Sequence, residues 1–338
     1  MDAVAALREV AYWLDRARAD SRRAIAYRRA ADVVAGLSEA ELRDLLARDW
    51  RDLAGVGPST GKVIAAALAG EVPATLAELR AAGAEPLTSG GAALRSAQRG
   101  DLHLHTTWSD GSASMAEMVA CAEALGHEWL AITDHSPRLR VANGLSAERL
   151  RAQLAEIEAL AADRDGEIRI LRGIEADIRA DGSLDQDPEL LADLDVVVAS
   201  VHSHLRADAE SMTHRMVRAI ANPRTNVLGH CTGRLVEGER GLRPPSVFDA
   251  EVVFEACRQF DVAVEINSRP ERCDPPDELL RLAAEMGCLF AINTDAHAPG
   301  QLEFFHYGCA RAQEMGIPAD RIITTWSAGT LLDWIAGG

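Results

Sequence analysis

Seven short runs of apolar and β-branched residues alternate with helical segments after residue 100 of this chain. The runs lie at residues 101–105, 129–133, 168–174, 195–201, 226–229, 262–267 and 288–294. Strands that alternate with helices indicate a parallel sheet, because parallel neighbours need a crossover connection between them. Seven such units predict a parallel α/β barrel.

Histidine and acidic residues stand at or just past the ends of six of these runs. His103 and His105 are two residues apart in a strand-like segment, so both rings are expected on one face. The sixth run ends differently, in Glu265-Ile266-Asn267-Ser268-Arg269. Parallel barrels carry their chemistry at the carboxyl ends of the strands. The set that we expect to meet there is His103, His105, Asp110, His135, Glu175, His202, His230, Asp295 and His297.

These donor types point to a metal centre. Neutral imidazoles and carboxylates suit Zn, Mn and Fe, and no cysteine joins the set. Nine donors predict two or three divalent ions, and paired ions suit phosphoester hydrolysis. The alternative is a group of unrelated polar residues, each satisfied locally; that interpretation fits any one position but not the whole set. His127, which precedes a run, is expected to be structural or exposed.

Composition narrows the class of protein. The 338 residues, 48% of them hydrophobic, suffice for one large domain and a small one. No apolar run is long enough to cross a membrane, no signal-peptide pattern is present, and the six cysteines lack paired spacing. A cytoplasmic chain without a membrane partner is therefore expected.

Charge is distributed unevenly along the chain. Residues 1–100 carry 14 Lys+Arg against 13 Asp+Glu, whereas the remainder carries 21 against 39, a net charge of −18. An acidic domain repels polyanions, although two or three bound divalent cations would offset about four to six of these charges. The charge alone therefore favours a small substrate over a nucleic acid.

The residues before the first run read as helices. Apolar spacing predicts helices at Val4–Ala19, Ser21–Leu37 and Glu39–Ala47, the last capped by Ser38 with Glu41 at the capping-box position. A small, polar stretch at 87–92 indicates a linker. The predicted organisation is a helical domain at 1–86, a linker at 87–99 and a barrel domain at 100–338.

A glycine-containing turn stands out in the helical domain. Leu53-Ala54-Gly55-Val56-Gly57-Pro58 fits the hairpin of a helix-hairpin-helix motif. Gly55 and Gly57 would let the backbone approach a DNA phosphate, and the next helix would offer free N–H groups to it. A plain helical hairpin is the alternative for this turn taken by itself.

The metal-ligand motifs, in this order and spacing, resemble those of the PHP (polymerase and histidinol phosphatase) domain family across residues 100–335. That resemblance implies an α/β fold, a distorted (βα)7 barrel with three metal ions. It assigns the first ion to His103, His105, Glu175 and Asp295, with Glu175 and Asp295 as catalytic residues. It assigns the second ion to Glu175, His202 and His230. The third ion falls to Asp110, His135 and His297.

Residues 1–85 are similar to the small all-α helix-hairpin-helix domain of bacterial family X DNA polymerases, which carry a PHP domain at the C-terminus. The linker at 87–99 is too short for a polymerase palm, so polymerase activity is not expected. Some relatives have a lyase lysine after the hairpin. Val63 falls at that position, and Lys62 lies one residue, about 100° of helix rotation, away. We expect Lys62 to be a surface lysine without a lyase role.

The expected reaction is phosphoester hydrolysis by a hydroxide that the metal ions activate. Four arginines closely follow strand ends, and an arginine fork matches a phosphate group. We expect Arg234 to act in catalysis and Arg138, Arg269 and Arg272 to bind substrate; ordinary surface arginines are the alternative.

Three functions remain open from the sequence. The domain resemblance favours processing of DNA ends, by a 3′–5′ exonuclease, a 3′-phosphatase or an abasic-site nuclease, with DNA-repair proteins as partners. The acidic charge favours hydrolysis of small phosphoesters such as histidinol phosphate or a nucleotide. The third function is a non-catalytic repair scaffold, which nine filled ligand positions disfavour.

Overall fold

The computed structural model describes residues 1–38, 40–42, 44, 53–164, 168–238 and 241–337. The chain divides into two compact units. The first unit is Met1–Pro86 with Ala298–Glu303, and the second is Leu87–His297 with Phe304–Gly338.

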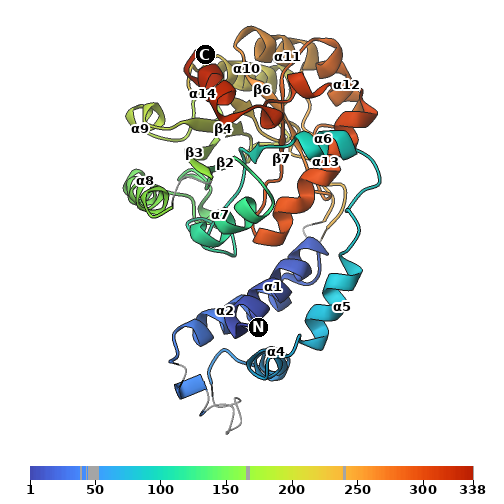
Figure 1. The fold of residues 1–338 in the computed structure, drawn as a ribbon. Helices are drawn as coiled ribbons and strands as arrows, with labels where there is room; N and C mark the ends of the chain where they lie inside the picture. The colour runs from blue at the N-terminus through green and yellow to red at the C-terminus, as the bar shows by residue number, and fades with distance from the viewer. Residues whose placement is uncertain (39, 43, 45–52, 165–167, 239–240, 338) are drawn as a thin grey trace. The chain divides into compact units, whose positions relative to one another are not determined.

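The second unit is built on seven parallel strands whose order in the sheet follows their order in the chain (Figure 1). A parallel bridge between Leu104 and Ala296, just past the first and last strands, brings the sheet close to a closed barrel. This arrangement confirms the predicted parallel barrel. The strands are β1 (Gly100–Asp101), β2 (Trp129–Ile132), β3 (Arg169–Asp177), β4 (Val196–Ser200), β5 (Val227–Leu228), β6 (Ala263–Asn267) and β7 (Phe290–Asn293).

Buried apolar residues explain the central strands. All residues of β2, β4 and β6 are buried, as expected for parallel strands that are covered on both faces. The first strand is shorter than predicted, because the Asp101 Oδ1 accepts the N–H of His103 at 3.0 Å and interrupts the ladder. The third strand is longer and includes Glu175, which the sequence placed at a strand end.

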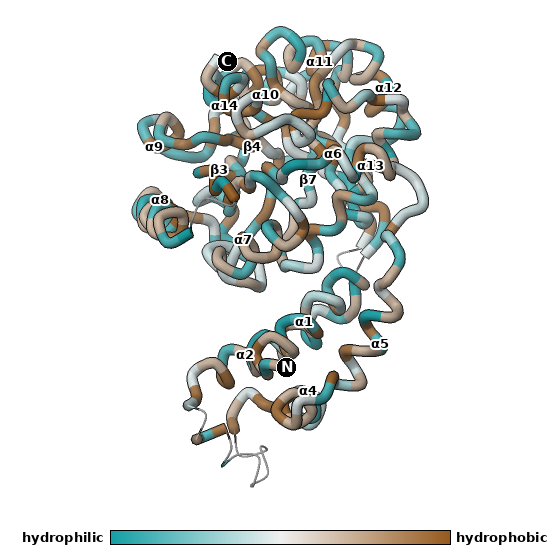
Figure 2. The backbone as a smooth tube through the Cα atoms, in the orientation of Figure 1, coloured by the Kyte–Doolittle hydropathy of each residue, from teal (hydrophilic) through white to brown (hydrophobic). Residues whose placement is uncertain are grey.

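Helices surround the strands and alternate between hydrophobic and hydrophilic residues along the chain (Figure 2). Side-chain caps define several starts; Ser114 Oγ accepts from Glu117 N, and Glu117 Oε2 accepts from Ser114 N. The helices of this unit are α6 (Ala92–Ala97), α7 (Met115–Ala124), α8 (Ala147–Ala162), α9 (Pro188–Ala192), α10 (Ala209–Ile220), α11 (Ala250–Gln259), α12 (Asp277–Glu285), α13 (Phe305–Glu314) and α14 (Ala328–Gly337). Short 3-10 helices lie at Arg140–Ala142, Pro299–Phe304, Ala319–Arg321 and Ile323–Thr325.

Alternate residues of the strands serve two cores. On β4, Val197 and Ala199 join the larger cluster, which includes residues of the outer helices. Val196 and Val198 join a smaller cluster with residues such as Leu171 of β3. Leu171 has the same parity as Glu175, so the smaller cluster marks the barrel interior on the side where Glu175 points. The barrel interior is therefore filled by apolar side chains, and its polar residues lie at the carboxyl ends of the strands.

The stretch predicted as a linker belongs to the second unit and contains α6. Gly91, with φ 75°, precedes this helix, and its N–H donates to Gln313 Oε1 at 2.9 Å. The domain boundaries at 86, 87 and 99 stay a prediction. The six cysteines are all free.

The described part of the first unit includes α1 (Ala3–Arg16), α2 (Ser21–Ala35), α4 (Pro58–Leu68) and α5 (Ala74–Ala82) around its own apolar core. Leu7, Val10 and Leu14 form the buried stripe of α1. The predicted helix at Glu39–Ala47 lies mostly outside the described residues. Its predicted cap is present: Ser38 N donates to Glu41 Oε2 at 2.8 Å, and Glu41 N donates to Ser38 Oγ at 3.4 Å.

The predicted hairpin leads into α4. Gly55 has a φ of 96°, which favours glycine, and a Cβ there would lie 3.2 Å from Val33 Cγ2. Gly57 precedes α4 with an extended backbone, and a Cβ there would meet no atom within 4 Å. Lys62 is exposed and Val63 is buried, which agrees with the expected surface position of Lys62.

Candidate metal centre

The barrel brings all nine predicted metal-binding side chains to the carboxyl ends of its strands. His103 and His105 follow β1, His135 follows β2, and Glu175 lies within β3. His202 follows β4, His230 follows β5, and Asp295 and His297 follow β7. Asp110 lies in the loop after His105. Six strands thus contribute, as parallel strands all end at the same edge of a barrel.

Glu175 stands at the middle of the group and is 1% exposed. Its Oε1 lies 3.3 Å from His103 Nε2, 3.2 Å from His202 Nε2 and 2.9 Å from His230 Nε2. Its Oε2 lies 2.6 Å from His135 Nδ1 and 3.7 Å from His105 Nε2. One carboxylate therefore faces five imidazoles, which suits a bridging ligand between ions.

Two further carboxylates flank Glu175. Asp295 Oδ1 lies 3.3 Å from His105 Nε2, and Asp110 Oδ1 lies 3.4 Å from both His135 Nε2 and His297 Nε2. The exposed fraction of the side chain is 33% for Asp110 and 3% for Asp295, so the centre opens on the Asp110 side.

The donor atoms form four groups whose members lie within 4.8 Å of one another. The group of His105, Asp110, His135 and His297 contains the third set implied by the resemblance, with His105 added. The other groups differ from the implied sets, because Glu175 pairs with His202 and His135 in one and with His103 and His105 in another. His103, His230 and Asp295 form the fourth group.

Several buried atoms of these side chains lack hydrogen bonds in the described part of the chain. They include Nε2 of His103, His105 and His202, and Oε2 of Glu175. Buried polar atoms without partners are rare in proteins, and an ion is one explanation for them. The unpaired nitrogens and the donor types together fit divalent metal ions.

Charges within the centre shift the pKa values of its carboxylates. Burial raises the pKa of Glu175, but the imidazoles of His202, His103 and His135 outweigh burial and hold it well below the ordinary value. Burial also raises the pKa of Asp295. The charges of Arg272 and His103 outweigh burial and hold that pKa well below its usual range. Both carboxylates are therefore ionised at neutral pH, the form that binds a cation.

Glu265, to which the sequence motifs assign no role, supports the centre from β6. Its Oε1 lies 2.6 Å from His103 Nδ1, and its Oε2 accepts the N–H of His230 at 2.6 Å. Asp177 plays a similar part for His202, because its Oδ1 accepts the backbone N–H of His202 at 3.0 Å. Such outer partners set the orientation of a ligating imidazole. The sequence signal for this role is a carboxylate within the apolar run at 262–267, because a buried charge is rarely left without a partner.

The four predicted arginines have different surroundings. Arg272 Nε donates to Asp295 Oδ2 at 3.0 Å, and Arg269 Nη1 donates to His297 Nδ1 at 2.8 Å. Arg234 Nε donates instead to the carbonyls of Arg272 and Cys273, each at 3.1 Å, and so holds the loop that carries Arg272. Arg138 is exposed. Arg269 and Arg272 thus lie at the centre, and all four roles stay predictions.

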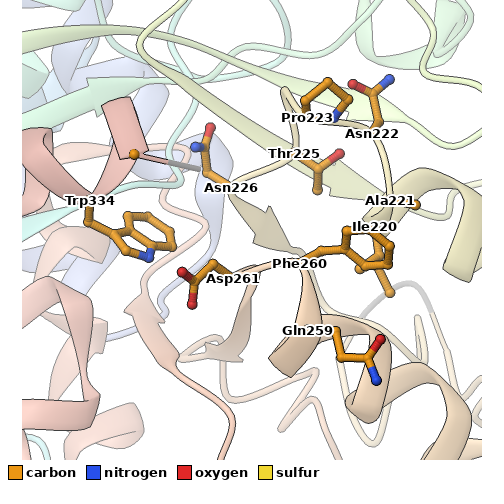
Figure 3. Close-up of a pocket in the computed structure, with 11 residues that line it drawn as sticks. Ile220, Ala221, Asn222, Pro223, Thr225, Asn226, Gln259, Phe260, Asp261 and Trp334 are labelled. Atoms are coloured by element: carbon orange, nitrogen blue, oxygen red, sulfur yellow. The ribbon is translucent and has the colours of Figure 1, made fainter.

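A separate cavity of about 410 Å³ lies next to the amino ends of β5 and β6 (Figure 3). Its lining includes Asn226, Phe260, Asp261 and Trp334, and none of the nine metal-binding candidates. Since parallel barrels carry their chemistry at the opposite end, this cavity does not belong to the centre.

Two family models match the chain. Residues 101–268 match the PHP domain, and residues 1–72 match a helix-hairpin-helix domain. The chain contains a PHP domain preceded by a helix-hairpin-helix domain. These matches confirm both resemblances that the sequence motifs indicated.

Named relatives of this PHP-domain chain fall into two kinds. DNA polymerase/3′-5′ exonuclease PolX of Bacillus subtilis (strain 168) is 41% identical over 216 residues, which are 64% of this chain and 37% of that protein. The chain thus matches little more than a third of that relative's length. A probable phosphatase of Aeromonas hydrophila is 28% identical over 245 residues, 70% of this chain and 92% of that protein. Homologues of this PHP domain are thus named as phosphatases and as an exonuclease.

One solved structure resembles the chain at a TM-score of 0.49 and 19% identity. It is the histidinol phosphate phosphatase from Lactococcus lactis, complexed with zinc, L-histidinol and phosphate. The resemblance covers 65% of this chain and 95% of that one.

In the described part of the PHP-domain chain, no helix has the length and apolar composition that a membrane crossing requires. The cytoplasmic location stays a prediction.

Proposed function

We propose that the chain is a metal-dependent phosphoesterase that hydrolyses the ends of DNA strands. The observation that carries the proposal is Glu175, one buried carboxylate facing five imidazoles, with two more carboxylates at 3.3–3.4 Å from members of that group. Two or three divalent ions, Zn, Mn or Fe, would be held by the nine side chains. Such ions supply water activation and neutralise charge on phosphoryl oxygens.

The chain's own residues prepare the site for that chemistry. Glu265 holds His103 through Nδ1 and thereby presents Nε2 to the centre. Arg272 holds Asp295 through Oδ2 and leaves Oδ1 on the His105 side. Because both arginines at the centre carry positive charge, they also favour an anionic phosphoester over a neutral ester.

The helix-hairpin-helix domain supports DNA as the substrate. The space beside Gly57, directly before α4, is open, since a Cβ there would meet no atom within 4 Å. Helix amino ends with free N–H groups bind phosphates. The Bacillus subtilis relative, whose name includes 3′–5′ exonuclease, supports the same substrate class.

A second candidate function is hydrolysis of small phosphoesters. Residues 101–338 carry a net charge of −18, which opposes a polyanion. The Aeromonas hydrophila relative, named a probable phosphatase, has 92% of its length covered by the alignment. On this alternative, the helical domain has a structural role.

The deciding experiment measures product release by Mn- or Zn-reconstituted protein on three substrates: single-stranded DNA, a 3′-phosphorylated nick and histidinol phosphate. We expect DNA shortening or 3′-phosphate loss with wild type and none with His103→Ala. His214→Ala, which removes an exposed histidine of α10, is the matched control and should retain full activity. Turnover of histidinol phosphate alone would overturn the DNA proposal, and full activity of His103→Ala would overturn the metal centre.

A further inference from the structure

The loop between β1 and α7 carries Asp110, the most exposed of the nine candidate ligands. Its side chain is 33% exposed, whereas the other eight are at most 16% exposed. Among the described residues, Asp110 and His297 occur only in the donor group that also contains His105 and His135. A carboxylate on an exposed loop keeps a fixed position only if the loop itself is held, because an unheld loop retains conformational entropy. The contacts that hold this loop therefore bear on ion binding by the whole group.

The first half of the loop is held by Asp134, a carboxylate that is 1% exposed and directly precedes His135. Its Oδ1 accepts the backbone N–H of Thr106 at 2.9 Å, the backbone N–H of Ser109 at 3.1 Å and the hydroxyl of Ser109. Its Oδ2 accepts from Thr106 Oγ1 at 2.7 Å and from Gln153 Nε2 at 2.6 Å. Two carboxylate oxygens thus receive five hydrogen bonds, four of them from the loop.

The second half of the loop is fastened to another candidate ligand. Ser112 donates to the carbonyl oxygen of His297 through its backbone N–H at 2.7 Å and through its Oγ at 3.1 Å. Gly111 allows the loop to close tightly, since a Cβ there would lie 2.6 Å from the carbonyl oxygen of His105. Asp110 therefore lies between two anchors, one next to a ligand of its group and the other on a ligand of its group.

We propose that Asp134 is a positioning residue that places Asp110 against its fellow ligands and thereby sets the affinity for the ion of this one group. Asp110 Oδ1 lies 3.4 Å from Nε2 of both His135 and His297. A loop that is already ordered in this arrangement avoids the entropy cost of ordering when an ion binds. The inference rests on the metal-dependent function proposed above and adds to it a residue that acts on one ion only.

The test compares Mn²⁺ binding by the full chain and by variants of Asp134 and Thr106. Metal-free protein is titrated with Mn²⁺, and the free ion is counted by electron paramagnetic resonance. Asp134→Asn keeps the size of the side chain but replaces an acceptor oxygen with an amide donor. Thr106→Val removes the hydroxyl that donates to Asp134, and Thr106→Ser keeps it as the matched control. Asp163→Asn, at an exposed position after α8, controls for the loss of an acidic side chain.

We expect Asp134→Asn and Thr106→Val to weaken the binding of one ion about 10- to 100-fold, the size of effect that an outer partner of a ligand has. The remaining ions should bind as in wild type, and a high concentration of Mn²⁺ should restore full occupancy. Thr106→Ser and Asp163→Asn should match wild type. Wild-type affinity for every ion in both Asp134→Asn and Thr106→Val, or an equal loss of all ions, would overturn the inference.

A double-mutant cycle separates the positioning of Asp110 from a general effect on the fold. Asp110→Ala removes a ligand that belongs to this group alone among the described residues. If Asp134 acts through Asp110, adding Asp134→Asn to Asp110→Ala should change Mn²⁺ binding no further; additive losses would overturn the inference. Hydrolysis is measured separately. Wild type that binds ions but cleaves none of the three substrates would remove the proposed function, while the binding cycle would still decide the role of Asp134.

Discussion

At the scale of single residues, Glu265 shows how one buried carboxylate can govern a site without belonging to its ligands. It contacts His103 through Nδ1 and the backbone of His230, from opposite oxygens. Two candidate metal ligands that follow different strands are thus held by one group. Loss of its charge should loosen both of them together.

We predict that Glu265→Gln weakens metal binding about 10- to 100-fold, because an outer partner that orients a ligating histidine has an effect of this size. The measurement is a competition titration against a chelator of known affinity. Glu285→Gln, an exposed glutamate at the end of α12, is the matched control. Unchanged affinity in Glu265→Gln would show that His103 is held by packing alone.

His127 is a residue whose burial predicts a pH effect. Neither ring nitrogen has a hydrogen-bond partner in the described part of the chain, and burial lowers its pKa from 6.5 to about 4. A lowered histidine pKa means that the unfolded state binds the proton more tightly. Titration of His127 therefore leaves the free energy of unfolding unchanged above pH 6.5 and lowers it as pH falls from 6.5 toward 4.

We predict that His127→Leu makes unfolding less sensitive to acid than in wild type. The difference between the two proteins should shift in favour of the variant by roughly 2 kcal/mol between pH 7 and pH 5. Urea denaturation at the two pH values measures it, and the other histidines cancel because both proteins share them. A constant difference at both pH values would contradict the buried neutral state of His127.

At the scale of elements, the turn before α4 separates two roles of glycine. Gly55 needs its positive φ, so a side chain there strains the backbone and meets Val33. Gly57 has ordinary extended backbone and open space at its Cβ position. The fold therefore does not require a glycine at this position, and we expect its lack of a side chain to serve close approach of a DNA phosphate.

We predict that Gly57→Ala lowers affinity for DNA without lowering the melting temperature of the protein. Gly55→Ala, in contrast, should lower both, with a stability loss of about 1 kcal/mol or more. Fluorescence anisotropy with labelled DNA and thermal denaturation supply the two readouts. DNA affinity that survives in Gly57→Ala would favour the plain helical hairpin.

At the scale of the whole molecule, the candidate metal centre draws its candidate ligands from six strands, including the first and the last. His103 and His105 follow β1, and Asp295 and His297 follow β7. An ion held by residues after both of these strands would link the two ends of the sheet. The first unit has a separate core, and its described residues include no candidate ligand.

We predict that divalent metal raises the melting temperature of the barrel unit and leaves that of the helical unit unchanged. At a hundredfold excess over Kd, a bound ion adds about 2.7 kcal/mol, which corresponds to roughly 5–10 °C for a unit of this size. Calorimetry with and without chelator measures the shift. A shift that persists in His103→Ala would place the stabilising ion elsewhere.

The sequence by itself determined the barrel, the nine candidate ligands and the hairpin. These depend on local patterns: alternation of strands and helices, polar residues at run ends, and glycine at a turn. Because all parallel strands in a barrel end at one edge, residues up to 194 positions apart, such as His103 and His297, could be placed together without coordinates.

Only the tertiary structure decided how those residues face one another. It placed Glu175 at the centre, made Glu265 a support for two ligands, and turned Arg234 toward backbone carbonyls. It also formed a cavity of about 360 Å³ beside Arg269, with lining residues that include members of the segments at 236–237, 267–270 and 307–311. Side-chain direction, pairing and enclosed volume depend on contacts between elements distant in sequence, and a local pattern carries no information about them.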